Sequence, residues 1–187
     1  ECNFSAPFGT LGTRPEKMVG QDPSLVKLVT KWVVDASNGT PVVVKVTPQV
    51  TDITEITKAV AEAGAQGITA ANSVPGIPGL DIDNGAPQPS VGGASCVSGM
   101  TGPAILPFSL SAIAGVAKTA NLTVFGSGGA ESWRDAVTMM LLGANAVQFC
   151  TAIMHHGFGL IDALKTGLAH HLERQGLESV DGLIGRA

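Results

Sequence analysis

The chain has 187 residues, which is enough for one domain with a sizeable core. Hydrophobic residues make up 44% and charged residues 14%, and the net charge of -4 leaves no basic stripe for nucleic acid. No apolar run approaches the ~20 residues that cross a bilayer. Three scattered cysteines without a CxxC pair predict reduced thiols in a cytoplasmic protein and no metal site. Because the first residue is Glu1, we expect the natural chain to begin upstream.

Short apolar strands alternate along the chain with helices of about 10–15 residues. This alternation predicts βαβ units and a parallel sheet covered by helices. A complete β/α barrel has eight strands, whereas an open doubly wound sheet needs fewer, so five strands leave both architectures open. The expected strands lie at 1–5, 41–47, 67–72, 122–126 and 146–150, and the expected helices at about 22–36, 52–65, 107–119, 131–142 and 160–173.

Two long loops, 6–21 and 73–102, follow predicted strands. Loops longer than about 15 residues are usually functional or disordered. Both leave the carboxyl ends of strands, where the active sites of β/α barrels lie. We therefore expect the functional site at this edge of the sheet.

A glycine cluster, Gly126-Ser127-Gly128-Gly129, ends one strand and opens onto a helix. Glycines let backbone N–H groups approach a phosphate closely, and the helix start favours negative charge. A second segment, Gln148–Thr151, ends the next strand, and consecutive loops of this kind form the common barrel phosphate site. The alternative is that these glycines only make tight turns.

Lys45 lies within a strand of valines, where a lysine is unusual unless it is paired or functional. Alternation directs it away from the helices if Val42, Val44 and Val46 face them, although a strand-end lysine could also extend to solvent. Asn3 and Asn72, the latter beside Ser73, lie near strand ends and could bind a ring that carries carbonyl and N–H groups. Turn formation is their alternative role.

The four histidines form two consecutive pairs, His155-His156 and His170-His171. No acidic residue accompanies either pair at the spacing of metal ligands. This favours surface or helix-end roles for all four.

Six collinear motifs resemble those of the FMN-binding barrel family of dihydroorotate and dihydropyrimidine dehydrogenases. The likeness covers nearly all of the chain and is strongest toward the dihydropyrimidine branch. The motifs are Asn3-Phe-Ser-Ala-Pro-Phe-Gly9, Gly20-Gln-Asp-Pro23, Lys45-Val-Thr-Pro48 with Asp52, Thr69-Ala-Ala-Asn-Ser-Val74, Gly99-Met-Thr-Gly102 and Ala104-Ile-Leu-Pro107.

The resemblance implies a TIM (β/α)8 barrel, of which this chain is the C-terminal portion, about strands 4–8. Residues 1–187 would then form one domain that lacks the first three β/α units of the barrel. It also implies an FMN-dependent oxidoreductase that acts on a C=C or CH–CH bond of a small cyclic nitrogenous substrate. Asn3, Asn72 and Ser73 would bind that substrate. By their positions in the resembled motifs, Lys45 and Asn72 would bind the FMN ring. The phosphate and ribityl chain would be bound by Gly102, Ser127, Gly128, Gly129, Cys150 and Thr151.

The chain departs from the family at Ala6, where a Cys or Ser acid/base is usual. A methyl group cannot transfer a proton, so the catalytic group is unknown. One alternative is a reaction that uses water or the substrate for proton transfer. Another is a flavin-binding electron-transfer or assembly subunit. In either case iron–sulfur clusters or FAD would belong to a partner subunit or to another domain, and the protein would be an oligomer or part of a larger assembly.

Overall fold

The computed structural model describes residues 1–5, 18–77, 79–88, 90–91, 94–95 and 98–187. A five-stranded parallel sheet forms its centre, and the spatial order of the strands follows their order in the chain. A doubly wound sheet would reverse its strand order at a switch point. The fold is therefore α/β with a parallel sheet, consistent with part of a TIM barrel. The strands are β1 (Cys2–Asn3), β2 (Val43–Lys45), β3 (Gly67–Ala70), β10 (Thr123–Ser127) and β11 (Ala146–Gln148).

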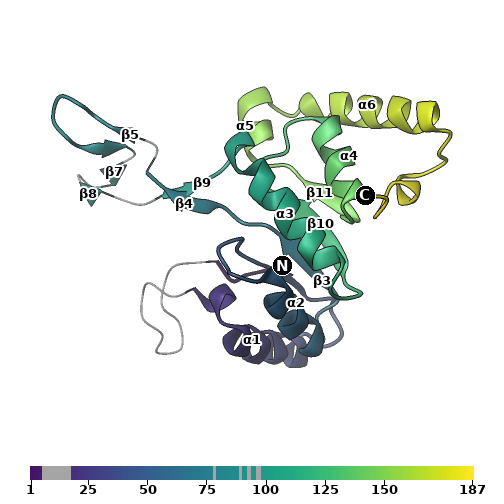
Figure 1. The fold of residues 1–187 in the computed structure, drawn as a ribbon, viewed down its shortest axis with the longest axis horizontal. Helices are drawn as coiled ribbons and strands as arrows, with labels where there is room; N and C mark the ends of the chain where they lie inside the picture. The colour runs from purple at the N-terminus through teal and green to yellow at the C-terminus, as the bar shows by residue number, and fades with distance from the viewer. Residues whose placement is uncertain (6–17, 78, 89, 92–93, 96–97) are drawn as a thin grey trace.

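Helices connect and cover these strands (Figure 1). No helix within the described ranges is long and apolar enough to cross a membrane. The α-helices are α1 (Pro23–Ala36), α2 (Ile53–Glu62), α3 (Leu106–Ala117), α4 (Trp133–Leu141), α5 (Thr151–His156) and α6 (Leu160–Gln175), and the 3-10 turns are η1 (Val19–Gln21), η2 (Pro103–Ile105) and η3 (Val180–Gly182).

The main core lies between one face of the sheet and the helices. Alternate residues of the strands face it, so Val44 and Ile68 are fully buried. Their helical neighbours in this core include Val60 of α2, Ile113 of α3 and Met139 of α4. The opposite face carries polar side chains, and Lys45 is one of them. This arrangement confirms that Val42, Val44 and Val46 are buried while Lys45 lies on the other face.

The expected elements of the sheet and its covering helices are present with small changes in their bounds. The helix α1 begins directly after Asp22 and ends at Ala36, as expected. Helix α2 ends at Glu62, earlier than the expected 65, because the chain turns at Gly64 with φ +90. Helix α5 was not predicted, since its six residues are too few to show a helical period.

The segment 73–102, which the sequence predicts as one long loop, contains several short strands. Short antiparallel strand pairs form an arm that extends away from the helices and the sheet (Figure 1). Strands of two or three residues have no recognisable alternation, and the Gly/Pro content hides them further. The arm contains β4 (Val74–Gly76), β5 (Gly79–Leu80), β6 (Pro87–Gln88), β7 (Ser90–Val91), β8 (Ala94–Ser95) and β9 (Ser98–Met100).

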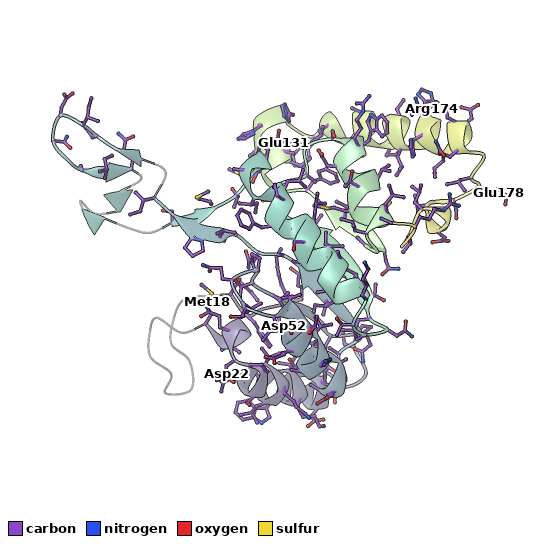
Figure 2. All side chains as sticks on the ribbon, viewed as in Figure 1. Met18, Asp22, Asp52, Glu131, Arg174 and Glu178 are labelled. Atoms are coloured by element: carbon purple, nitrogen blue, oxygen red, sulfur yellow. The ribbon has the colours of Figure 1, made fainter. Side chains whose placement is uncertain are left out.

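Asp52 caps α2 and should give the protein a pH-dependent increment of stability (Figure 2). Hydrogen bonds from Thr54, one from its backbone N–H at 2.8 Å, hold the pKa of the Asp52 carboxyl below its usual range. Because the pKa of Asp52 is lower in the folded protein than in the unfolded chain, the ionised carboxylate stabilises the folded state. This stabilisation is fully present at pH values above the unfolded-state pKa of about 3.9, and it is lost as the pH falls through the folded-state pKa.

We therefore expect Asp52→Ala to lower the melting temperature at neutral pH and to lower it less at about pH 3, where the unfolded pKa of about 3.9 has been passed. Thermal unfolding followed by circular dichroism at both pH values measures this. Asp52→Asn is the matched control, because an amide can accept the same hydrogen bond without titrating. An alanine variant whose deficit grows on acidification would contradict the assignment.

Candidate functional site

A pocket lies at the carboxyl ends of β2, β3, β10 and β11, the edge that the sequence indicates. It gathers every residue predicted to bind a cofactor, together with Ser73, from segments far apart in the chain. Its described lining consists of Lys45, Ala71, Asn72, Ser73, Thr101, Gly102, Ile105, Ser127, Gly128, Gly129, Ala130, Gln148, Cys150 and Thr151.

The turn after β10 forms one wall of this pocket and packs closely against α3. Gly128 has φ +102 and Gly129 has φ +85, a conformation that favours glycine. A Cβ on Gly129 would lie 2.6 Å from the backbone nitrogen of Leu106, and one on Gly128 would lie 2.4 Å from Ser109 Oγ. Both positions therefore require glycine for space as well as for backbone conformation.

A second wall comes from Gly102 and from the start of α5. Gly102 has φ +76, and a Cβ there would lie 3.4 Å from Thr151 Cγ2, so the two residues are neighbours. Neither η2, which begins after Gly102, nor α5, which begins after Cys150, has a side-chain cap at its start. Pro103 has no N–H, and the N–H of Ile105 is bonded to the Gly102 carbonyl, so the start of α5 is the better source of backbone donors for an anion. The three segments together form a cradle suited to a phosphate.

Lys45 projects from the polar face of the sheet into this region. In the strand register Asn3 pairs with Lys45, and Lys45 pairs with Thr69, so the three lie in one row on the same face. The Lys45 ammonium donates to Gln148 Oε1 at 3.2 Å and lies 3.6 Å from a carboxylate oxygen of Glu1. Its side chain is only 21% exposed, which excludes the alternative of a lysine extended into solvent.

Glu1 completes this network, and the sequence analysis did not identify it. Its carboxylate accepts from Thr69 Oγ1 at 2.5 Å and from Gln148 Nε2 at 2.8 Å. Burial alone would raise the pKa of Glu1, but the hydrogen bonds from Thr69 and Gln148 and the charge of Lys45 outweigh it, so the pKa is lowered. An ionised carboxylate therefore faces the Lys45 ammonium at neutral pH.

The two predicted asparagines meet at the same edge. Asn72 Nδ2 donates to Asn3 Oδ1 at 2.9 Å and also to the hydroxyl of Ser5. Asn3 Oδ1 accepts in addition from Ser5 Oγ at 2.7 Å, and Asn72 Oδ1 accepts from the backbone N–H of Ser73 at 2.8 Å. These bonds hold both amides in fixed orientations beside the pocket, a constraint that turn formation alone does not explain.

Ala6, which occupies the acid/base position of the resembled family, lies outside the described residues. The structure does show where Cys2 is directed. Cys2 lines a different hollow of about 520 Å³ on the helix side of β1, together with Val29 and Trp32 of α1. Cys2 therefore faces the helix side of the sheet, opposite to Asn3.

His155 and His156 are exposed at the end of α5, and His170 is exposed toward the end of α6, as expected. His171 is half-buried, and its ring lies 5.6 Å from that of Trp133, centroid to centroid. One feature was missed. The fold places Glu131, which follows the glycine turn, beside His155 and His156 at the end of α5. His155 Nδ1 lies 3.4 Å from Glu131 Oε1. His155 and His156 therefore have no acidic neighbour at ligand spacing in the sequence, but they do have one, Glu131, in the folded chain.

A parallel β/α sheet with a glycine-lined pocket and a half-buried lysine at its carboxyl edge has the site placement typical of β/α-barrel proteins. Comparison with known proteins gives the family. The dihydroorotate dehydrogenase family matches residues 1–172, and the chain belongs to that family. It is a family of FMN-dependent CH–CH oxidoreductases.

Relatives divide between two branches at similar identity. The catalytic subunit of dihydroorotate dehydrogenase B (NAD(+)) from Pyrococcus horikoshii is 39% identical over 187 residues, covering all of this chain and 59% of the relative. The NAD-dependent dihydropyrimidine dehydrogenase subunit PreA of Escherichia coli K12 is 36% identical over 190 residues, covering all of this chain and 46% of the relative. The chloroplastic dihydropyrimidine dehydrogenase (NADP(+)) of Arabidopsis thaliana is 33% identical over 193 residues, covering all of this chain and 45% of the relative. The chain thus spans about half the length of these relatives, and identity does not separate the branches.

Proposed function

We propose that this chain is the FMN-binding portion, about strands 4–8, of a (β/α)8 barrel oxidoreductase acting on a C=C or CH–CH bond of a cyclic nitrogenous substrate. The observation that carries the proposal is the single pocket in which Lys45 lies with the glycine cradle. Residues 1–187 then form one domain of a larger cytoplasmic protein, which is an oligomer or works with an electron-transfer partner that holds iron–sulfur clusters or FAD.

The residues present fit FMN. Glycine at positions 128 and 129 lets the turn after β10 pack against α3, because a Cβ at either position would collide with a residue of that helix. In the pocket beside this turn, the loops after β10 and β11 would hold the phosphate together with Gly102, Cys150 and Thr151. Lys45 would lie at the ring, where an ammonium stabilises negative charge. Bound FMN supplies hydride-transfer chemistry.

The amides of Asn3 and Asn72 support a cyclic amide-like substrate. An amide both donates and accepts hydrogen bonds, which matches a ring bearing C=O and N–H groups. Both are held by Ser5 and by each other, so they are already oriented before a ligand arrives. Preorganisation of this kind lowers the entropic cost of binding. Ser73 lies beside them in the pocket lining and would contact the same substrate.

The test uses the intact polypeptide that carries these residues, purified without added flavin. We expect one FMN per chain, and rapid loss of the oxidised flavin absorbance under anaerobic conditions with either a 5,6-dihydropyrimidine or dihydroorotate. The faster substrate identifies the branch. Protein that neither carries nor binds FMN would contradict the proposal at its first step.

Ala6 favours a second candidate, a flavin-binding electron-transfer or assembly subunit without the family's acid/base chemistry. The same experiment separates the two. Retained FMN that stays oxidised with both substrates, yet is reduced by a partner subunit and NADH, would support this second candidate. Substrate-dependent reduction of the flavin supports the oxidoreductase, with water or the substrate serving for proton transfer.

A further inference from the structure

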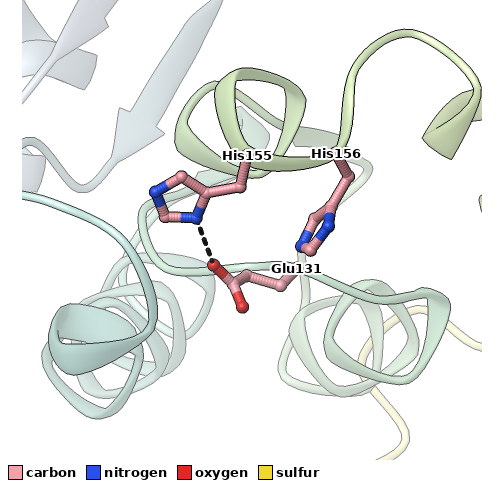
Figure 3. A group of neighbouring side chains, drawn as sticks. All are labelled: Glu131, His155 and His156. Atoms are coloured by element: carbon pink, nitrogen blue, oxygen red, sulfur yellow. Dashed lines mark ion pairs between the residues drawn. The ribbon is translucent and has the colours of Figure 1, made fainter.

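A cluster of one carboxylate and two imidazoles lies outside the flavin pocket and has no part in the function proposed above. Glu131 comes from the segment between the glycine turn and α4, and His155 and His156 end α5. Figure 3 shows the two rings on either side of the Glu131 carboxylate. One ligand atom from each residue lies within 4.8 Å of the others, close enough to share a single ion.

The contact between Glu131 and His155 has the geometry of two metal ligands rather than of a hydrogen bond. Glu131 Oε1 and His155 Nδ1 are 3.4 Å apart, the range of an ion pair with a protonated ring, as the dashed line in Figure 3 marks. Apart from that contact, Glu131 Oε1 is buried and has no hydrogen-bond partner among the described residues. A buried carboxylate oxygen without a partner is costly and needs an explanation. Two ligands about 2.1 Å from a tetrahedral zinc ion lie about 3.4 Å apart, the observed separation.

The donor set indicates the class of ion. Imidazole nitrogens suit zinc and neighbouring transition metals, whereas magnesium and calcium prefer sites made of oxygen alone. Both histidines are exposed, so water can complete the coordination. We propose that Glu131, His155 and His156 bind one divalent transition-metal ion of the zinc class. The ion would tie the segment after β10 to the short helix after β11.

The test is titration of the metal-free, untagged intact polypeptide with Zn²⁺ by calorimetry and with Co²⁺ by visible spectroscopy, in flavin-free protein. We expect one tight site per chain and a rise in melting temperature with Zn²⁺, because an ion that binds only the folded state stabilises it. Glu131→Gln, His155→Ala and His156→Ala should each weaken that site at least about tenfold.

The matched control is His170 on α6, an exposed histidine. His170→Ala should leave the site unchanged, because this residue belongs to no cluster of ligands in the described structure. Equal losses in control and site variants, or tight binding that survives Glu131→Gln, would overturn the proposal. Glu131→Gln keeps the test decisive if a histidine variant unfolds, since it preserves size. The result does not depend on whether the protein binds FMN.

Discussion

Replacing Gly129 with alanine should abolish tight flavin binding and destabilise the fold. The residue has φ +85, and the new Cβ would lie 2.6 Å from the backbone nitrogen and 2.7 Å from the Cα of Leu106. Backbone atoms at the start of α3 cannot move aside as a flexible side chain can, so the turn itself must shift. Because about 1.4 kcal/mol of local distortion corresponds to a tenfold change in Kd, we expect FMN affinity to fall at least about tenfold.

Gly39→Ala is the matched control for this prediction. Gly39 has nearly the same backbone conformation, φ +83, but a Cβ there has no atom within 4 Å. Both variants incur the cost of a positive φ, and only Gly129→Ala adds the steric clash. We expect Gly129→Ala to lower the unfolding free energy by about 1–3 kcal/mol more than Gly39→Ala does.

Denaturant unfolding and FMN titration measured on both variants provide this comparison. An equal loss of stability in the two variants would show that the contact with Leu106 is not restrictive. Unchanged FMN affinity in a folded Gly129→Ala protein would remove the turn after β10 from the cofactor site.

The sheet and its covering helices could be predicted because their sequence signals are local. Valine-rich segments such as 42–46, which only Lys45 interrupts, mark strands covered by helices, and Asp22-Pro23 marks a helix start. The choice between a barrel and a doubly wound sheet was not local. It depends on which strands become neighbours, and the chain-ordered parallel sheet is consistent with part of a barrel.

The candidate site was predictable where it follows strand alternation and the carboxyl edge of the sheet. Lys45 and the glycine turn were found in this way. Glu1 shares a face with Asn3, so extending the same alternation by one step could have found it. The cluster of Glu131 with His155 and His156 could not be found, since its members come together only because β10 and β11 pair.

Replacing Lys45 with methionine should impair turnover far more than FMN binding. Among the described residues that line the pocket, Lys45 is the only one with a charged side chain. Methionine keeps much of the length and removes the charge. If the ammonium stabilises negative charge at the flavin ring, its loss should reduce turnover by about 10²–10³, the scale seen when one such group is removed.

The reduction potential of bound FMN distinguishes a direct electrostatic role of Lys45 from a merely structural one, because a structural role would leave the potential unchanged. If Lys45 holds the ring, its replacement by methionine would remove a positive charge there and leave the Glu1 carboxylate, which lies 3.6 Å from Lys45 Nζ, without that counter-charge. Both effects disfavour added electrons, so the midpoint potential should become more negative. The pKa of Glu1 should also rise, because Lys45 is one of the groups that lower it.

Lys27→Met is the matched control, because it removes the same charge from an exposed position. Lys27 pairs with Glu62 at 2.7 Å on the surface, and its side chain is 54% exposed. Exposed pairs contribute about 0–1 kcal/mol, so turnover and flavin potential should stay as in the unchanged protein. If Lys45→Met left the flavin potential unchanged, the ammonium would act only through its bond to Gln148 in the folded strand network. A more negative potential together with nearly unchanged FMN affinity would place Lys45 at the reacting ring and leave phosphate binding to the glycine cradle.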